Sequence, residues 1–575
     1  MRRFILTTIA FFSCFVCFAA TTVIEPELAA EMQRLDDSEK IKINILLTEQ
    51  SDATALLRET EFYSNKQEQR QFVIETLKQQ AEASQAELLK NLEDMERNGI
   101  VEDVQPFWLV NCVSCKATKT AINDLAQRHG IMTIYHLEEA QWIFEQEATP
   151  APKSNDREIT QNLLQVNAPQ VWEQGHTGSG VLIALIDTGV RLDHADLAGR
   201  LWDGGTEYPN HGYDFYYHDN DPSDDRGHGT HVAGTICGTG ASGSQTGIAA
   251  GATIMALKAF NNEGVGEETH WVAAMQFALE HGADLMNMSL GRPQPNAAQK
   301  LMMRQACDNT LAAGVVVAAC AGNLRQMGFM VPPPNNIYTP GDCPPPHLHE
   351  DQLVNAGGLS CVISVGAVDY DNTIAPFSSE GPSQWTDVTQ YNDYPYTAGS
   401  TTEIGLIRPD ICAPGVQIKS LDYNTTDGYT LMDGTSMATP LVGGTIALML
   451  SKNHELTPAQ IDEILERTTV KLTEHKSNDF GAGLLDALAA VNAVDPDAVS
   501  ETQSEIGVYP NPSKENFTIV GDGINSVSVI SVEGKLLKTI EVNGNECRIN
   551  GLPNGVFVLK IDTSQGVIVN KIVKM

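Results

Sequence analysis

The stretch VLIALIDTGV, residues 181–190, indicates the fold class of the longest part of the chain. An unbroken apolar run leads up to Asp187, so a strand at this place must be covered on both faces. Comparable apolar runs follow further along the chain, namely TIMALKAF, ADLMNMSL, GVVVAACAG and CVISVGAV. Helical stretches such as EETHWVAAMQFALEHG, residues 267–282, lie between several of them. The pattern predicts an α/β fold of three layers, in which a mostly parallel central sheet lies between helices.

A small α+β unit is predicted ahead of this region, within residues 21–155. The segment IKINILL, residues 41–47, alternates as a half-buried strand does. Residues 67–99 indicate one long charged helix, and residues 107–136 indicate strand, helix and strand. The stretch EATPAPKSNDRE, residues 147–158, is typical of an exposed linker. The apolar face of the long helix is formed by Val73, Leu77, Ala81, Leu88, Leu92 and Met95.

Both ends of the chain differ from its middle. Residues 1–20 carry two arginines, an apolar run and two final alanines, which is the pattern of a cleaved secretory signal. No later segment has the roughly 18 uninterrupted apolar residues of a spanning helix, so we expect no transmembrane segment. Residues 505–575 alternate in short strands and predict a small all-β sandwich. The predicted α/β domain therefore extends over residues 156–498.

Charge excludes one class of function. The 575 residues include 37 Lys and Arg against 73 Asp and Glu, a formal net charge of −36. So acidic a chain repels nucleic acid and anionic lipid surfaces, so we expect no nucleic-acid partner.

Three separate motifs carry residues that together suggest nucleophilic catalysis. Asp187 lies where a buried strand meets a turn, His228 lies in DRGHGTHVAG, and Ser436 lies in DGTSMATP just before an apolar helix. Taken singly they read as a turn aspartate, a structural histidine and a helix cap. A serine hydroxyl, however, needs an imidazole to take its proton, and the imidazole needs a carboxylate to orient it. The combination predicts an Asp–His–Ser triad.

An acyl-transfer site also needs a donor for the oxyanion. Asn323, at the end of the buried stretch GVVVAACAG, has the position and the amide for that role. The positive end of the helix that begins beside Ser436 favours the same developing charge.

The motifs IALIDTGVRLDHADL, GHGTHVAGTICG, GIAAGATIMALKAF, MNMSLG, AGN and GTSMATPLVGG together resemble the subtilisin-type serine peptidases. The stretch NAPQVWEQGHTGSGV resembles the bacillopeptidase F branch most closely. The resemblance implies the triad Asp187, His228 and Ser436, with Asn323 as the oxyanion donor. It also implies that the substrate-binding residues are Ser289, Leu290, Gly291 and Gly322.

The flanking units fit the same resemblance. Residues 21–155 resemble an inhibitor-type propeptide, which would block the cleft until it is cut within about residues 145–160. The tail resembles a type IX secretion sorting domain in VYPNPSKENFTI, VISVEGKLLKT and its closing strands. The implied protein is secreted or attached to the cell surface after export through the periplasm. Its partners are protein or peptide substrates, its own propeptide and the secretion machinery.

A structural calcium ion is the one cofactor that the resemblance raises. Asp196 matches a family calcium position, but the partner loop has Ala241 where the family has an asparagine ligand. The acidic loop at residues 219–225 offers oxygen ligands too, or is simply solvated. We therefore expect no cofactor in the chemistry and take Asp196 as a weak candidate for a metal ligand.

Two alternatives to a general secreted endopeptidase stay open at this point. One is a processing peptidase with a single dedicated target. The other is an inactive surface-binding protein on a peptidase scaffold, which would be expected to have a broken triad.

Overall fold

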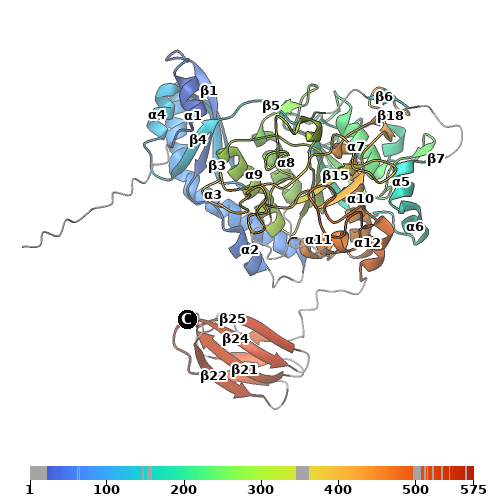
Figure 1. Ribbon diagram of the computed structural model, residues 1–575. Coiled ribbons are helices and arrows are strands. Elements are labelled where there is room, and N and C mark those ends of the chain that lie inside the picture. Colours follow the sequence, from blue (N-terminus) through green and yellow to red (C-terminus); the bar gives the residue numbers. More distant parts are fainter. Residues whose placement is uncertain are drawn as a thin grey trace, which may run out of the picture. The chain divides into compact units, whose positions relative to one another are not determined.

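The computed structural model describes residues 23–60, 63, 65–144, 148–151, 158–344, 352, 362–495 and the greater part of 507–574 (Figure 1). The predicted signal segment at residues 1–20 and most of residues 345–361 lie outside the described residues. The chain divides into two compact units, Met1–Pro496 and Asp497–Met575, and each is described by itself.

A parallel sheet of seven strands is the centre of the first unit. Its order is β16 (Ile411–Pro414), β15 (Val362–Val368), β14 (Val316–Cys320), β13 (Leu285–Met288), β8 (Leu182–Asp187), β11 (Thr253–Lys258) and β9 (Gly212–Asp214). Ile183 and Leu185 of β8 pack into one core, whereas Ala184 and Ile186 pack into a second core on the other face. Burial on both faces explains the continuous apolar runs and confirms the predicted three-layer α/β fold.

Helices cover both faces of this sheet (Figure 1). The first core contains residues of α5 (Gln161–Gln165), α6 (Ala168–Glu173), α7 (His228–Cys237), α10 (Thr435–Lys452), α11 (Pro458–Arg467) and α12 (Ala487–Ala493). The second core contains residues of α8 (Glu268–Glu280) and α9 (Ala297–Ala312). Short strands complete this part: β5 (Ala140–Gln141), β6 (Thr149–Pro150), β7 (Glu158–Ile159), β10 (Ser244–Gln245), β12 (Val265–Gly266), β17 (Ile418–Leu421) and β18 (Tyr429–Met432).

The predicted α+β unit forms an antiparallel sheet of four strands in the order β2-β3-β1-β4. The elements are α1 (Pro26–Met32), β1 (Lys40–Leu47), α2 (Ala53–Thr60), α3 (Lys66–Arg97), β2 (Val101–Phe107), β3 (Cys112–Thr118), α4 (Lys119–Leu125) and β4 (Ile131–His136). Asn65 caps α3 by accepting hydrogen bonds from the next turn, and Gly99 follows the helix in a left-handed conformation. All the residues predicted for the apolar face of α3 are buried.

The expectation of a half-buried strand at residues 41–47 was incomplete. Ile43 and Ile45 of β1 pack into the core of the small unit, as predicted. Leu46, on the opposite face, joins the core that contains α8 and α9. Both faces of the small sheet are therefore covered, one by its own helices and the other by the large domain. Cys112 and Cys115 likewise point into these different cores from opposite faces of β3.

The second unit contains two antiparallel sheets. One has the order β19 (Gly507–Tyr509), β20 (Phe517–Val520) and β23 (Glu546–Ile549). The other has the order β22 (Leu536–Glu541), β21 (Ile524–Ser531), β24 (Gly555–Thr563) and β25 (Gly566–Lys574). Phe517, Val527 and Leu559 belong to one shared apolar core between the sheets. The all-β prediction for the tail is confirmed.

Candidate active site

Asp187 and His228 meet at the carboxyl end of β8. The Nδ1 of His228 donates to the Oδ1 of Asp187 over 2.7 Å, and both side chains are almost fully buried. The backbone N–H of Thr188 donates to the same oxygen over 2.7 Å. Burial raises the pKa of the Asp187 carboxyl, and the contact with His228 opposes that rise. A carboxylate can only accept, so the ring proton sits on Nδ1 and the lone pair is on Nε2.

Glycine is required for this approach of α7 to β8. A Cβ on Gly229 would lie 2.0 Å from the carbonyl oxygen of Gly189 and 3.1 Å from the Oδ1 of Asp187. Gly227, just before the helix, has a φ of 105°, which disfavours other residues. The two glycines around His228 therefore let the imidazole reach the carboxylate.

Asp224 holds the loop in front of His228, a role that the sequence analysis missed. Its Oδ1 accepts from the backbone N–H groups of Arg226 and Gly227 over 3.0 and 2.8 Å, and from the hydroxyl of Thr188 over 2.9 Å. Its Oδ2 accepts from the backbone N–H of Thr230 over 2.9 Å. Asp224 is thus a structural acceptor for the loop before His228. Its position just ahead of a helix that starts without its own cap was the available signal.

Ser436 lies in the first turn of α10, which packs in one core with α7. Its Oγ donates to the carbonyl of Ser289 over 3.1 Å, and the hydroxyl of Ser289 donates to the carbonyl of Ser436 over 2.9 Å. Ser289 directly follows β13, so the nucleophile candidate lies at the carboxyl edge of the sheet with Asp187.

Asn323 is fixed by Thr435, the residue before Ser436. The Oδ1 of Asn323 accepts from both the backbone N–H and the hydroxyl of Thr435, each over 3.0 Å. The backbone N–H of Gly322 in turn donates to the hydroxyl of Thr435 over 3.1 Å. Because Thr435 fixes the amide oxygen of Asn323, the NH₂ group of the same amide faces away from Thr435, where it can act as a donor. Thr435 is a second residue that the sequence analysis did not single out.

Two of the predicted substrate-binding residues, Gly291 and Gly322, lie against the side chain of Tyr338. A Cβ on either Gly291 or Gly322 would lie 2.6 Å from atoms of Tyr338. Tyr338 is only 2% exposed and lies in the connection between β14 and β15. Leu290 is fully buried in the core beneath, so only its backbone can face a ligand.

A segment of the N-terminal unit lies along these residues. The strand β5 pairs antiparallel with β12, and the backbone N–H of Trp142 donates to the carbonyl of Gly264 over 3.0 Å. The backbone N–H of Gly291 donates to the carbonyl of Trp142 over 3.1 Å. The indole N–H of Trp142 also donates to the carbonyl of Gly266 over 3.0 Å. The segment is therefore held from both sides by backbone hydrogen bonds, in the manner of an added strand.

Protein donors contact both carboxylate oxygens of Asp196, the weak candidate for a calcium ligand. Its Oδ1 accepts from the backbone N–H of Ser242 over 2.7 Å, and its Oδ2 accepts from the hydroxyl of Tyr429 over 2.8 Å. Each oxygen therefore uses one of its lone pairs on a protein donor, and a calcium role of Asp196 stays a weak prediction. Within the part of the chain that the structure describes, no group of three or more His, Cys, Asp or Glu residues is arranged to hold a metal.

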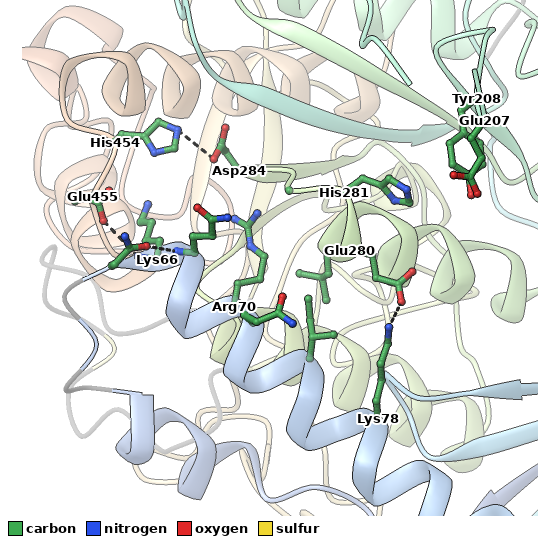
Figure 2. Close-up of a pocket in the computed structure, with 16 residues that line it drawn as sticks. Lys66, Arg70, Lys78, Glu207, Tyr208, Glu280, His281, Asp284, His454 and Glu455 are labelled. Carbon is green, nitrogen blue, oxygen red and sulfur yellow. Dashed lines mark hydrogen bonds and ion pairs between the residues drawn. The ribbon is translucent and has the colours of Figure 1, made fainter. Parts of the chain in front are cut away.

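A cavity of about 740 Å³ lies near the amino end of β13, the end opposite to the one that carries Ser289 (Figure 2). Asp284, which precedes β13, accepts from His454 over 3.2 Å, and Lys66 and Arg70 of α3 line the same cavity. Figure 2 shows these side chains converging from the helix and the large domain. The cavity is therefore a boundary between the two parts and not the candidate catalytic site.

Comparison with known proteins gives two family matches. The model of the subtilase family matches residues 178–483, and that of the secretion system C-terminal sorting domain matches residues 507–575. The chain is 29% identical to bacillopeptidase F of Bacillus subtilis over 77% of its own length, but it spans only 30% of that relative. It is 29% identical to the serine protease AprX of Bacillus subtilis, over 66% of the chain and 79% of the relative. It is 31% identical to subtilisin DY of Bacillus licheniformis, over 56% of the chain and 96% of the relative.

Proposed function

Because the chain belongs to the subtilase family and is a serine endopeptidase, we propose that Ser436 is its nucleophile, with His228 as the base and Asp187 as the orienting carboxylate. The observation that carries this assignment is the buried 2.7 Å hydrogen bond between His228 and Asp187. It leaves the Nε2 of His228 as the ring nitrogen that can take a proton. Ser436 begins the helix that packs against the helix of His228.

The proposed reaction follows from these positions. Ser436 attacks the scissile carbonyl while His228 takes its proton, and the imidazolium is stabilised by Asp187. The oxyanion is held by the side-chain NH₂ of Asn323 and by the backbone N–H of Ser436. His228 then protonates the leaving amine, and water releases the acyl group by the same steps with the proton moving in reverse.

The C-terminal unit concerns export and not catalysis. Residues 507–575 match a secretion sorting domain, so the protein is exported and is secreted or attached to the cell surface. None of the helices within the described residues is long and apolar enough to cross a membrane.

We further propose that the N-terminal unit inhibits the peptidase until it is removed. The support is the segment around Trp142, which forms backbone hydrogen bonds with Gly264 on one side and Gly291 on the other. A protein substrate would need the same backbone groups. The intact precursor therefore has its own chain where a substrate would bind.

Labelling with a fluorophosphonate probe tests the proposed nucleophile. The processed protein is expected to be labelled at Ser436, whereas the Ser436→Ala variant stays unlabelled and loses about 10⁴-fold or more in kcat/KM on a peptide substrate. Circular dichroism of both proteins checks that the variant is folded. Equal labelling of the two proteins would show that the serine is assigned wrongly.

A further inference from the structure

We propose that Cys307 and Cys343 form a disulfide bond in the exported protein, and that this bond ties α9 to the turn that carries Tyr338. The inference goes beyond the proposed function, because it concerns a covalent modification of the peptidase domain and not its reaction. Disulfides form and persist in the oxidising compartments that exported chains enter. The match of the C-terminal unit to a secretion sorting domain places this chain among exported proteins.

The two side chains meet in the core that contains α8 and α9. Cys307 lies on α9, Cys343 lies in the connection between β14 and β15, and both side chains belong to that core. Neither side chain is exposed to solvent. The thiol of Cys343 is in hydrogen-bond contact with the thiol of Cys307. A thiol–thiol contact is an arrangement from which an S–S bond of about 2.05 Å can form.

The backbone around each cysteine is held in place. The carbonyl of Cys343 accepts from the guanidinium of Arg408 over 2.8 Å, and its N–H donates to the carbonyl of Pro340 over 2.9 Å. Cys307 lies in the interior of the 16-residue helix α9, whose backbone groups bond within the helix. The contact between the two thiols is therefore a consequence of the fold around both of them.

Other described cysteines have different surroundings. Cys237 lies in the first core, on the other face of the sheet. The thiol of Cys320 donates to the carbonyl of Leu290 over 3.3 Å. The thiol of Cys412 donates to the carbonyl of Asp479 over 3.6 Å. The structure thus favours one particular pairing.

The oxidation is a thiol–disulfide exchange with a thiol oxidoreductase of the exporting compartment. The thiolate of one cysteine attacks the disulfide of the oxidoreductase, and the thiolate of the other then displaces it from the mixed disulfide. The two cysteines lose two electrons and two protons, and the oxidoreductase leaves as a dithiol that has gained both. Burial raises the pKa of the Cys343 thiol, so the folded interior disfavours its thiolate. We therefore expect the exchange to occur during folding, before α9 and the connection close over the two thiols.

The bond would fix the turn that carries Tyr338. The N–H of Tyr338 donates to the carbonyl of Ala321 over 2.9 Å, and its carbonyl accepts from the N–H of Asp342 over 2.9 Å. The ring of Tyr338 lies against Gly291 and Gly322. A covalent link between this turn and α9 restrains the unfolded chain and so stabilises the folded domain. It also holds the ring against the predicted substrate-binding residues.

Peptide mapping tests the bond. The full-length Ser436→Ala precursor is collected after export and denatured without reductant, and its free thiols are blocked with N-ethylmaleimide. A protease that cleaves before aspartate then digests it. Because aspartates lie between them, the digest leaves four cysteines in four different peptides, namely Cys307, Cys320, Cys343 and Cys361.

We expect the peptides of Cys307 and Cys343 as one linked species, lighter than their sum by two hydrogen atoms, which separates on reduction. Blocking of both thiols by N-ethylmaleimide in the unreduced protein would overturn the inference. A link between Cys343 and Cys361, which lies outside the described residues, would overturn it too. Neither result bears on the proposed function, which the labelling of Ser436 tests independently.

Thermal unfolding tests the effect of the bond on stability. We expect dithiothreitol to lower the unfolding midpoint of the Ser436→Ala precursor by roughly 5 °C or more. Cys307→Ala in the same precursor should show no effect of the reductant, whereas Cys320→Ala, which removes another buried thiol, should retain it. An unchanged midpoint in the parent precursor would overturn the stabilising role. An equal effect of the reductant in Cys307→Ala would assign that role to a different pair.

Discussion

Single residues next to the candidate triad determine whether its members meet. Asp224 is the clearest example, because it accepts hydrogen bonds from the loop before His228 and from the first turn of α7. It acts through the positions of His228 and Thr188, the residue after Asp187. Such a residue should affect the rate of the reaction more than the binding of substrate.

We therefore predict that Asp224→Asn lowers kcat roughly 10-fold or more with little change in KM. An amide has one oxygen where the carboxylate has two, so at least one buried donor loses its partner, at a cost of about 1–3 kcal/mol. Steady-state kinetics measure the loss of kcat, and the urea midpoint of unfolding measures the loss of stability. Asp221→Asn, in the same acidic loop but exposed, is the matched control and should change neither.

Thr435 offers a second prediction at this scale. Its hydroxyl donates to the Oδ1 of Asn323 and accepts from the N–H of Gly322, so it fixes the amide of the proposed oxyanion donor. We expect Thr435→Val to lower kcat about 10-fold, less than the 10²–10³-fold for removal of such a donor itself. Thr435→Ser keeps the hydroxyl and should retain most of the activity. A Val variant as active as the Ser variant would contradict the role of this hydroxyl.

Among the elements, the helix α3 shows what a local pattern can predict. Its apolar stripe repeats with the period of a helix, and the side chains of Val73, Leu77 and Leu92 are buried as expected. The parallel strands were predictable for a similar reason, since runs that are apolar on both faces need cover on both faces. Asp187, Ser289 and Asn323 follow three such strands, so their common edge could be inferred from the sequence.

The strands β1 and β5 have contacts with distant segments that a local sequence pattern could not predict. The alternation in β1 predicted one buried face, and the second face is buried only because α8 and α9 lie against it. The strand β5 has just two residues, and its hydrogen bonds come from segments more than a hundred positions away. Thr435 was missed for the same reason, because its partners Gly322 and Asn323 are more than a hundred positions away. Most donors to Asp224 are local, so its place before an uncapped helix could have identified it.

The β5 segment leads to a prediction about latency. Trp142 is 1% exposed, packs against Trp271 and Phe260, and donates its indole N–H to Gly266. We expect Trp142→Ala to loosen the segment, so that the fluorophosphonate labels the full-length precursor roughly 10-fold faster than the wild type. Trp142→Phe retains a ring but no N–H and should be intermediate. Equal labelling rates for all three precursors would show that the segment does not protect Ser436.

At the scale of the whole molecule, the contact between the N-terminal unit and the peptidase buries titratable groups. Glu268, in the first turn of α8, is fully buried against Tyr135 and Cys112 of the small sheet, with Glu267 and Arg292 of the large domain nearby. Burial raises its pKa to about 7. If removal of the N-terminal unit exposes this carboxyl, its pKa falls back toward its ordinary value.

The sign of the pH effect follows from linkage. The closed state binds the proton of Glu268 more tightly than the open state, so closure is fully favoured below about pH 4.5 and weakens as pH rises to about 7. Lys66, at the cavity of Figure 2, acts in the opposite direction because burial lowers its pKa to about 8. Lys66 strengthens closure as the pH rises above about 8. This contribution is smaller than that of Glu268, since Lys66 is only partly buried.

We therefore predict that the cut N-terminal unit binds the peptidase most weakly between about pH 7 and 8. Its dissociation constant there should be up to about 10²-fold higher than at pH 5. The measurement uses the Ser436→Ala precursor, cut by added enzyme and then passed over a sizing column at each pH. The fragment should stay bound at pH 5 and separate at pH 7.5. In Glu268→Gln the side chain is neutral at every pH, so the fragment should stay bound at both. Release of the Glu268→Gln fragment with the wild-type pH profile would assign the effect to another group.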